Sequence, residues 1–184
     1  MALAAEPVDV FLSPGEHFVG DAQYRVHTLL GSCVSITLWH ARWHVGAMSH
    51  FLLAERGSHS RYGALDGRYG GEALVLMERD LAARGIAAAD CEARLFGGAD
   101  MFPGNACSLH VGRRNGETAR ALLSARGIRV VGDNLFGHSH RRLVFDIATG
   151  LVSLRGPDEA GDSTLGPLVT RPGNVVRRLS DLPR

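Results

Sequence analysis

The sequence predicts a single domain of mixed α/β class, with mixed and antiparallel sheets and two to three flanking helices. Short runs in which polar and apolar residues alternate, as in strands, recur along the chain. Two longer segments instead repeat their apolar residues every three or four positions and end at a glycine, as amphipathic helices do. With 184 residues and 45% apolar content, the chain has the size and hydrophobicity of one globular domain.

The elements follow from these patterns in order. The expected strands cover residues 8–12, 24–30, 33–39, 45–53, 93–96, 128–131, 142–146 and 151–154. The first helix is expected at 73–84, with an inner stripe of Leu74, Met77 and Leu81. The second is expected at 111–126, with an inner face of Ala121, Leu122 and Ala125. Residues 156–184 carry few large apolar side chains, so we expect a domain at 1–155 followed by a loosely ordered extension at 156–184.

Composition excludes several classes of function. The chain has 20 basic and 19 acidic residues, and it lacks the basic stripe that a nucleic-acid-binding surface needs. All the basic residues are arginine, which excludes a Schiff-base lysine and a phosphate-binding lysine of the Walker type. Three cysteines without a Cys-x-x-Cys spacing argue against a disulfide framework. With no signal peptide and no apolar run long enough for a membrane span, the sequence predicts a cytoplasmic protein that does not insert into membranes.

The most informative local pattern pairs a cysteine with a histidine. Cys33 closes a Gly31-Ser32-Cys33 turn at the start of one expected strand, and His50 lies on the next. A hairpin centred on Ala41 and Arg42 would place Cys33 directly opposite His50, with both side chains on one face of the sheet. An imidazole at that position can take the proton of the thiol and later protonate a leaving amine.

Glycines near this pair predict the rest of a site. The approach through Gly31 and Ser32 leaves consecutive backbone N–H groups free to bind an oxyanion beside the sulfur. Gly97 and Gly98 end a later strand, where the backbone could approach a ligand closely, although a tight strand exit explains them equally well. The alternative for Cys33 itself is a buried thiol that only fills the core.

A second group of polar residues is the His138-Ser139-His140 segment. On a strand, both imidazoles would lie on one face at a spacing that can hold a metal ion. A metal site needs three or four convergent ligands, and no acidic residue or cysteine lies at a matching spacing. We therefore predict no metal and no cofactor, and interpret these histidines as solvated loop residues.

Ordered motifs across about residues 8–154 resemble one known family, the chemoreceptor glutamine deamidase CheD family. They are Pro14-Gly15-Glu16, Thr28-Leu29-Leu30-Gly31-Ser32-Cys33-Val34-Ser35-Ile36, Gly46-Ala47-Met48-Ser49-His50-Phe51-Leu52-Leu53, Phe96-Gly97-Gly98-Ala99-Asp100-Met101, and Arg141 through Gly150. The resemblance implies a mixed α/β fold related to the catalytic core of cytotoxic necrotizing factor deamidases. It also implies hydrolysis of glutamine side-chain amides on chemoreceptors, giving glutamate and ammonia.

The resemblance assigns roles and partners as well. Cys33 and His50 match the cysteine and histidine of the family's catalytic triad, and Thr28 matches the third member, with His27 as the neighbouring position. The expected partners are chemoreceptor cytoplasmic domains and a CheC-type phosphatase. Where the family has a Gly-rich stretch before the Phe145-Asp146 hairpin, this chain carries residues 138–140, which is a departure on the substrate side.

Two other functions stay open from the residues alone. The chain could be a non-catalytic adaptor that binds receptors or a CheC-type phosphatase, with the thiol and imidazole unused. It could also be a metal-dependent hydrolase that uses its histidines, which predicts activity sensitive to chelators. A low-pKa Cys33 that is alkylated at neutral pH would favour the deamidase over the adaptor.

Overall fold

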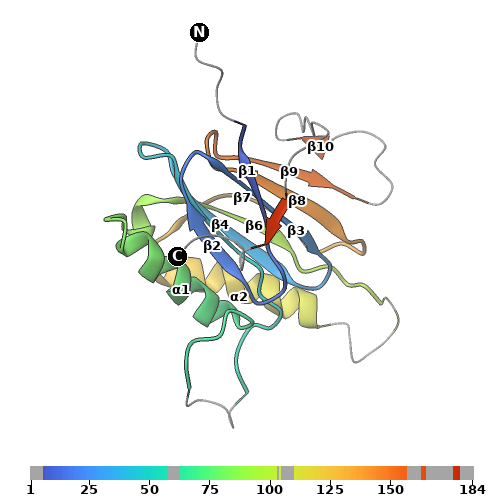
Figure 1. Ribbon diagram of the computed structural model, residues 1–184. Helices are drawn as coiled ribbons and strands as arrows, with labels where there is room; N and C mark the ends of the chain where they lie inside the picture. Colours follow the sequence, from blue (N-terminus) through green and yellow to red (C-terminus); the bar gives the residue numbers. More distant parts are fainter. Residues whose placement is uncertain are drawn as a thin grey trace.

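Two β-sheets packed face to face form the body of the protein, and two helices cover the far side of one of them (Figure 1). The computed structural model describes residues 6–57, 63–102, 104 and 110–156, together with the backbone of 163–164 and 176–178. This arrangement confirms the mixed α/β class. No helix among the described residues is both long and apolar enough to cross a membrane.

The sheet that contacts the helices, called here the central sheet, has the strand order β2-β5-β4-β6-β7. Its strands and the helices are β2 (His17–Gly20), β4 (Val34–His40), β5 (Val45–Ser49), β6 (Glu92–Gly97), β7 (Arg129–Leu135), α1 (Gly70–Ala82) and α2 (Val111–Ala125). A short 3-10 turn, Ala88–Asp90, leads into β6. Antiparallel pairs join β2 to β5, β5 to β4 and β4 to β6, and β6 runs parallel to β7.

The second sheet, called here the outer sheet, has the order β10-β9-β8-β3-β1-β11. Its strands are β1 (Val8–Phe11), β3 (Tyr24–Leu30), β8 (Arg141–Asp146), β9 (Leu151–Arg155), β10 (Ser163–Thr164) and β11 (Val176–Arg178). Within the predicted extension, β10 pairs with β9 and β11 pairs with β1, and most of the remaining residues of 156–184 lie outside the described residues.

Two apolar layers form because successive side chains along the strands of the central sheet point to opposite faces. Val34, Ile36 and Leu38 of β4 face the helices and pack with the predicted α1 stripe, which is confirmed as fully buried. The intervening residues of β4 face the outer sheet. The layer between the sheets contains Val10, Leu12, Phe18, Val26, Leu30, Met48, Phe96, Leu143, Phe145, Ile147 and Val152. Burial of these side chains is the main contribution to the stability of the sandwich.

The predicted hairpin register was wrong by two residues. Thr37 pairs with Met48 and Val34 with Phe51, so Cys33 lies diagonally from His50 rather than opposite it. The cause is the connection, which is a four-residue loop at 41–44 rather than a turn centred on Ala41 and Arg42. His44 in that loop adopts a positive φ of 47°. Because side chains alternate with a period of two, a shift of two keeps both residues on the predicted face.

The predicted inner face of the second helix was also wrong. Ala121 and Ala125 are exposed and Leu122 is only half-buried. The buried face consists instead of Gly112, Asn115, Gly116, Ala119 and Leu123. Small residues and a polar one occupy this stripe because the helix lies very close to the loop that follows β6. A Cβ atom on Gly112 would lie 2.5 Å from the Ala99 carbonyl oxygen and 2.6 Å from that of Gly98.

Candidate active site

Thr28 and His50 form a buried hydrogen bond between the two sheets. Thr28 is on β3 of the outer sheet, and His50 directly follows β5 of the central sheet. The distance from Thr28 Oγ1 to His50 Nδ1 is 2.7 Å, and the threonine hydroxyl donates to the Leu12 carbonyl at 2.9 Å. A hydroxyl has one hydrogen to donate, so its oxygen accepts from Nδ1–H of the histidine. This assignment leaves Nε2 of His50 without a proton and with its lone pair available.

The unprotonated nitrogen is held in an apolar environment. His50 Nε2 is buried and has no hydrogen-bond partner among the described residues. Burial lowers the pKa of His50 to about 4, and a hydrogen bond to the Leu12 backbone acts in the opposite direction. The imidazole is therefore neutral at pH 7, which is the state that can accept a proton.

Cys33 lies on the same side of the central sheet as His50. Its half-buried side chain packs against the apolar layer between the sheets, as does Met48, two residues before His50. Burial raises the pKa of the Cys33 thiol, while its own backbone N–H acts to lower it. The resting thiol is therefore protonated at neutral pH. Cys33 does not have the lowered pKa that would make it a thiolate at rest. A thiol in this state becomes a nucleophile only when a nearby base takes its proton.

The other cysteines differ from Cys33. Cys91 is buried in the layer under the helices, and burial raises the pKa of its thiol to about 11. Such a thiol is unreactive at neutral pH. Cys107 lies outside the described residues. Cys33 is thus the described cysteine that combines partial exposure with a histidine placed diagonally from it in the strand register.

The turn before Cys33 is held through its carbonyl groups. Gly31 C=O accepts from the Ala99 N–H at 2.9 Å, and Cys33 C=O accepts from the Gly98 N–H at 2.8 Å. Ser32 C=O accepts from a side chain, Asn115 Nδ2, at 3.1 Å. The N–H groups of Ser32 and Cys33 donate to no carbonyl among the described residues. Two adjacent N–H groups beside a sulfur are the donors that an oxyanion hole requires.

Gly97 and Gly98 approach the cysteine turn itself. Both have a positive φ, 104° and 68° respectively. A Cβ atom on Gly97 would lie only 2.2 Å from the Cys33 carbonyl oxygen. The two glycines therefore shape the backbone beside Cys33, as a strand exit that supports the cysteine turn.

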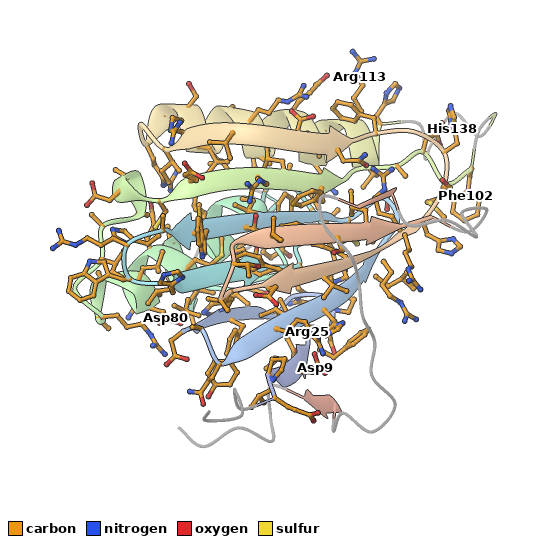
Figure 2. All side chains as sticks on the ribbon, turned by 90° about the horizontal axis from the view of Figure 1, so that it is seen from above. Asp9, Arg25, Asp80, Phe102, Arg113 and His138 are labelled. Atoms are coloured by element: carbon orange, nitrogen blue, oxygen red, sulfur yellow. The ribbon has the colours of Figure 1, made fainter. Side chains whose placement is uncertain are left out.

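His27, the neighbour of Thr28, faces the other side of the outer sheet. Its Nε2 lies 2.6 Å from Oδ1 of Asp9, whose carboxylate also binds Arg25 through two hydrogen bonds. In Figure 2, Asp9 and Arg25 lie together in the lower part of the view, on the side of the molecule opposite α2. Burial lowers the pKa of His27. Between the two neighbours, the residue that contacts His50 is Thr28.

Sequence reasoning missed Asn115. This residue is 1% exposed on α2, and its Nδ2 also donates to the Leu52 carbonyl at 2.7 Å. The sequence pattern that could have indicated it is a polar residue at the centre of a stripe of small residues, Gly112, Gly116 and Ala119. The predicted inner face lay on a different side of the helix and did not include this stripe.

His138 and His140 are exposed in the connection between β7 and β8 rather than on a strand. Figure 2 shows His138 at the same end of the molecule as Phe102. A hollow of about 1040 Å³ opens next to this connection, between β7 and strands β8 and β9, and His140 contributes to its lining. Thr28, Cys33 and His50 do not line it. Among the described residues, no three histidine, cysteine or acidic side chains converge as metal ligands would.

The fold and this geometry define an α/β protein with a thiol and a threonine-bound imidazole at one end of a two-sheet core. The sequence model of the family described as CheD chemotactic sensory transduction matches residues 52–156. The chain belongs to the CheD family. The matched residues begin after His50 and do not include Thr28, Cys33 or His50.

Several relatives are similar over most of the chain. A probable chemoreceptor glutamine deamidase CheD 2 from Albidiferax ferrireducens is 53% identical over 152 residues, 82% of this chain and 88% of the relative. A probable chemoreceptor glutamine deamidase CheD 1 from Chromobacterium violaceum is 43% identical, covering 85% of this chain and 82% of the relative. A probable chemoreceptor glutamine deamidase CheD from Pseudomonas syringae pv. tomato is 36% identical, covering 79% and 87%.

Proposed function

We propose that this protein is a cysteine-dependent chemoreceptor glutamine deamidase that acts in the cytoplasm and contributes to adaptation in chemotaxis. The observation that carries the proposal is the Thr28–His50 hydrogen bond, which leaves His50 Nε2 unprotonated, on the side of the central sheet that also holds the Cys33 thiol. The substrate class follows from membership of the CheD family and from the names of the relatives. The reaction needs no metal and no cofactor.

In the first half of the reaction, His50 Nε2 takes the proton of the Cys33 thiol as the sulfur attacks the side-chain carbonyl carbon of a glutamine. The N–H groups of Ser32 and Cys33 stabilise the negative oxygen of the tetrahedral intermediate. The carbon–nitrogen bond then breaks, and the proton on His50 leaves with the nitrogen as ammonia. The product is a thioester on Cys33.

In the second half, the neutral His50 takes a proton from water as the water oxygen attacks the thioester carbon. The carbon–sulfur bond breaks, and the proton returns to the sulfur. Thr28 fixes the tautomer and the orientation of the imidazole throughout, in the manner of the third member of a triad. The net change is glutamine plus water to glutamate plus ammonia.

The test is mass spectrometry of a receptor cytoplasmic domain after incubation with the protein. Each converted glutamine gains the mass that replacement of an amide NH₂ by OH produces, and ammonia is released in equal amount. The Cys33→Ala variant should give neither signal, while Cys91→Ala, which alters a cysteine under the helices, should keep both. Undiminished ammonia release by Cys33→Ala would rule out the mechanism.

The adaptor function remains the alternative, and the same experiment separates the two. An adaptor would bind the receptor domain or a CheC-type phosphatase without changing the receptor's mass. A deamidase that also binds a CheC-type phosphatase would change the receptor's mass and bind the phosphatase as well. Binding is therefore measured with Cys33→Ala, in which catalysis is absent and the surface is otherwise unchanged.

A further inference from the structure

Asn115 joins the two segments that carry the proposed nucleophile and base. Its side-chain amide comes from α2 and donates to Ser32 C=O at 3.1 Å and to Leu52 C=O at 2.7 Å. Ser32 directly precedes Cys33, and Leu52 lies two residues after His50. The amide is almost fully buried, with an exposed fraction of 1%. A buried amide in this position is stabilising because both of its N–H groups find carbonyl acceptors.

The hydrogen bond to Ser32 sets the direction of the next N–H group. In a planar trans peptide the carbonyl and the following N–H point in opposite directions. Because Ser32 C=O points at α2, the N–H of Cys33 points away from the helix, toward its own sulfur. The contribution of that N–H to lowering the thiol's pKa is consistent with this direction. The Ala99 N–H orients the N–H of Ser32 in the same way, through Gly31 C=O.

We propose that Asn115 is a positioning residue that holds the Ser32–Cys33 peptide with its N–H directed into the oxyanion hole. This inference rests on the proposed thiol mechanism, since it assigns Asn115 a role in stabilising the tetrahedral intermediate. Asparagine suits the position because both contacts are donated to carbonyls. An aspartate of the same shape would bring a carboxylate against two carbonyl oxygens and would repel them.

The sequence of α2 places the amide within reach. Gly112 and Gly116 flank Asn115 on the buried face, and neither can carry a side chain without displacing its neighbours. A Cβ atom on Gly116 would lie 2.7 Å from the ring of Phe136. The helix therefore lies close enough to the cysteine turn for the short asparagine side chain to reach Ser32 C=O.

The experiment compares Asn115→Asp and Asn115→Ala with the wild-type protein in two reactions of Cys33. Deamidation of a receptor domain passes through an oxyanion, whereas alkylation by iodoacetamide does not. Loss of an oxyanion-hole donor lowers kcat by about 100- to 1,000-fold, so kcat for deamidation should fall by that amount with little change in KM. The rate of alkylation should fall far less than kcat, because alkylation loses only the small effect of the Cys33 N–H on the thiol's pKa. Ala119→Gly, on the same buried face, is the control for a destabilised helix.

Two results would overturn the inference. Deamidation at the wild-type kcat in both variants would show that Asn115 does not act on the oxyanion hole. An equal loss of deamidation and alkylation, shared by Ala119→Gly, would assign Asn115 a purely structural role.

A third reaction tests the role of Asn115 without depending on deamidase activity. A short ¹³C-labelled aliphatic aldehyde adds the Cys33 sulfur to its carbonyl carbon, giving a hemithioacetal whose oxygen occupies the same hole. Asn115→Asp should weaken this adduct relative to wild type, and equal stability would again overturn the inference. If the wild-type protein converts no receptor glutamine, the proposed function fails, while the aldehyde still tests Asn115.

Discussion

Thr28 and His50 lie on different sheets, and their side chains meet across the apolar layer at an Oγ1–Nδ1 distance of 2.7 Å. This contact links the packing of the sandwich to the chemistry of the candidate site. The imidazole can keep its orientation only while the two sheets keep their relative position. Neither residue is more than 3% exposed, so water does not compete for the hydrogen bond.

Thr28→Val removes the hydroxyl and keeps the shape of the side chain. The Nδ1–H of His50 and the Leu12 carbonyl both lose their hydrogen bond to the hydroxyl, so the free energy of unfolding should fall by about 1–3 kcal/mol. Deamidation should fall by about 100-fold or more because the base loses its fixed tautomer. Thr28→Ser restores the hydroxyl and should recover most of the activity. Equal loss in both variants would mean that the hydroxyl is not the group that matters.

The pKa of His50 predicts how stability depends on pH. Its pKa is about 4 in the folded protein and 6.5 in the unfolded chain, so between these values only the unfolded chain binds the proton. The contribution of His50 should therefore be constant above about pH 7. As pH falls from 6.5 to 4 it should destabilise the fold, by about 3 kcal/mol in total. Denaturant unfolding as a function of pH measures this loss.

The control for this prediction is His50→Gln, which removes the titrating ring. Its stability should fall less steeply between pH 6.5 and pH 4 than that of the wild-type protein. His27, whose pKa is also lowered by burial, titrates in both proteins and cancels in the comparison. Parallel stability curves for the two proteins would contradict the assignment of a buried neutral imidazole.

Gly97→Ala should displace the backbone of the Gly31-Ser32-Cys33 turn. The new Cβ would overlap the Cys33 carbonyl oxygen at 2.2 Å, at a positive φ of 104°. Gly127→Ala is a matched control, because Gly127 has a positive φ of 65° but no atom within 4 Å of the added Cβ. Both variants incur the backbone cost of about 1–2 kcal/mol. Only Gly97→Ala should also lose the alkylation and deamidation reactions of Cys33.

Ser35→Ala should leave the fold as stable as wild type or raise its free energy of unfolding by about 1 kcal/mol. The Ser35 hydroxyl is fully buried and has no hydrogen-bond partner among the described residues. Ser49, equally buried, differs because its Oγ accepts from the Ile36 N–H at 3.3 Å. Ser49→Ala should therefore lower the unfolding free energy by about 1 kcal/mol. Thermal unfolding of the two variants side by side checks the contrast, and a loss in both would contradict it.

Local patterns in the sequence determined most of the secondary structure. Tyr24–Leu30 was predicted with its observed bounds, and the α1 stripe of Leu74, Met77 and Leu81 was predicted residue by residue. These features depend on the period of apolar residues, which neighbouring positions display directly. Strand β2 (His17–Gly20) was missed because its two large apolar residues, Phe18 and Val19, are adjacent and do not alternate with polar ones.

The sequence alone also determined which residues could do chemistry, since it contains Cys33 after a Gly-Ser turn and His50 on the next strand. Only the tertiary structure decided that Thr28 rather than His27 contacts the imidazole, that the register differs by two residues, and that Asn115 holds the cysteine turn. Each of these depends on how one sheet lies on the other, or how a helix lies on a loop. Such contacts join residues far apart in the chain, and no local period encodes the distance between them.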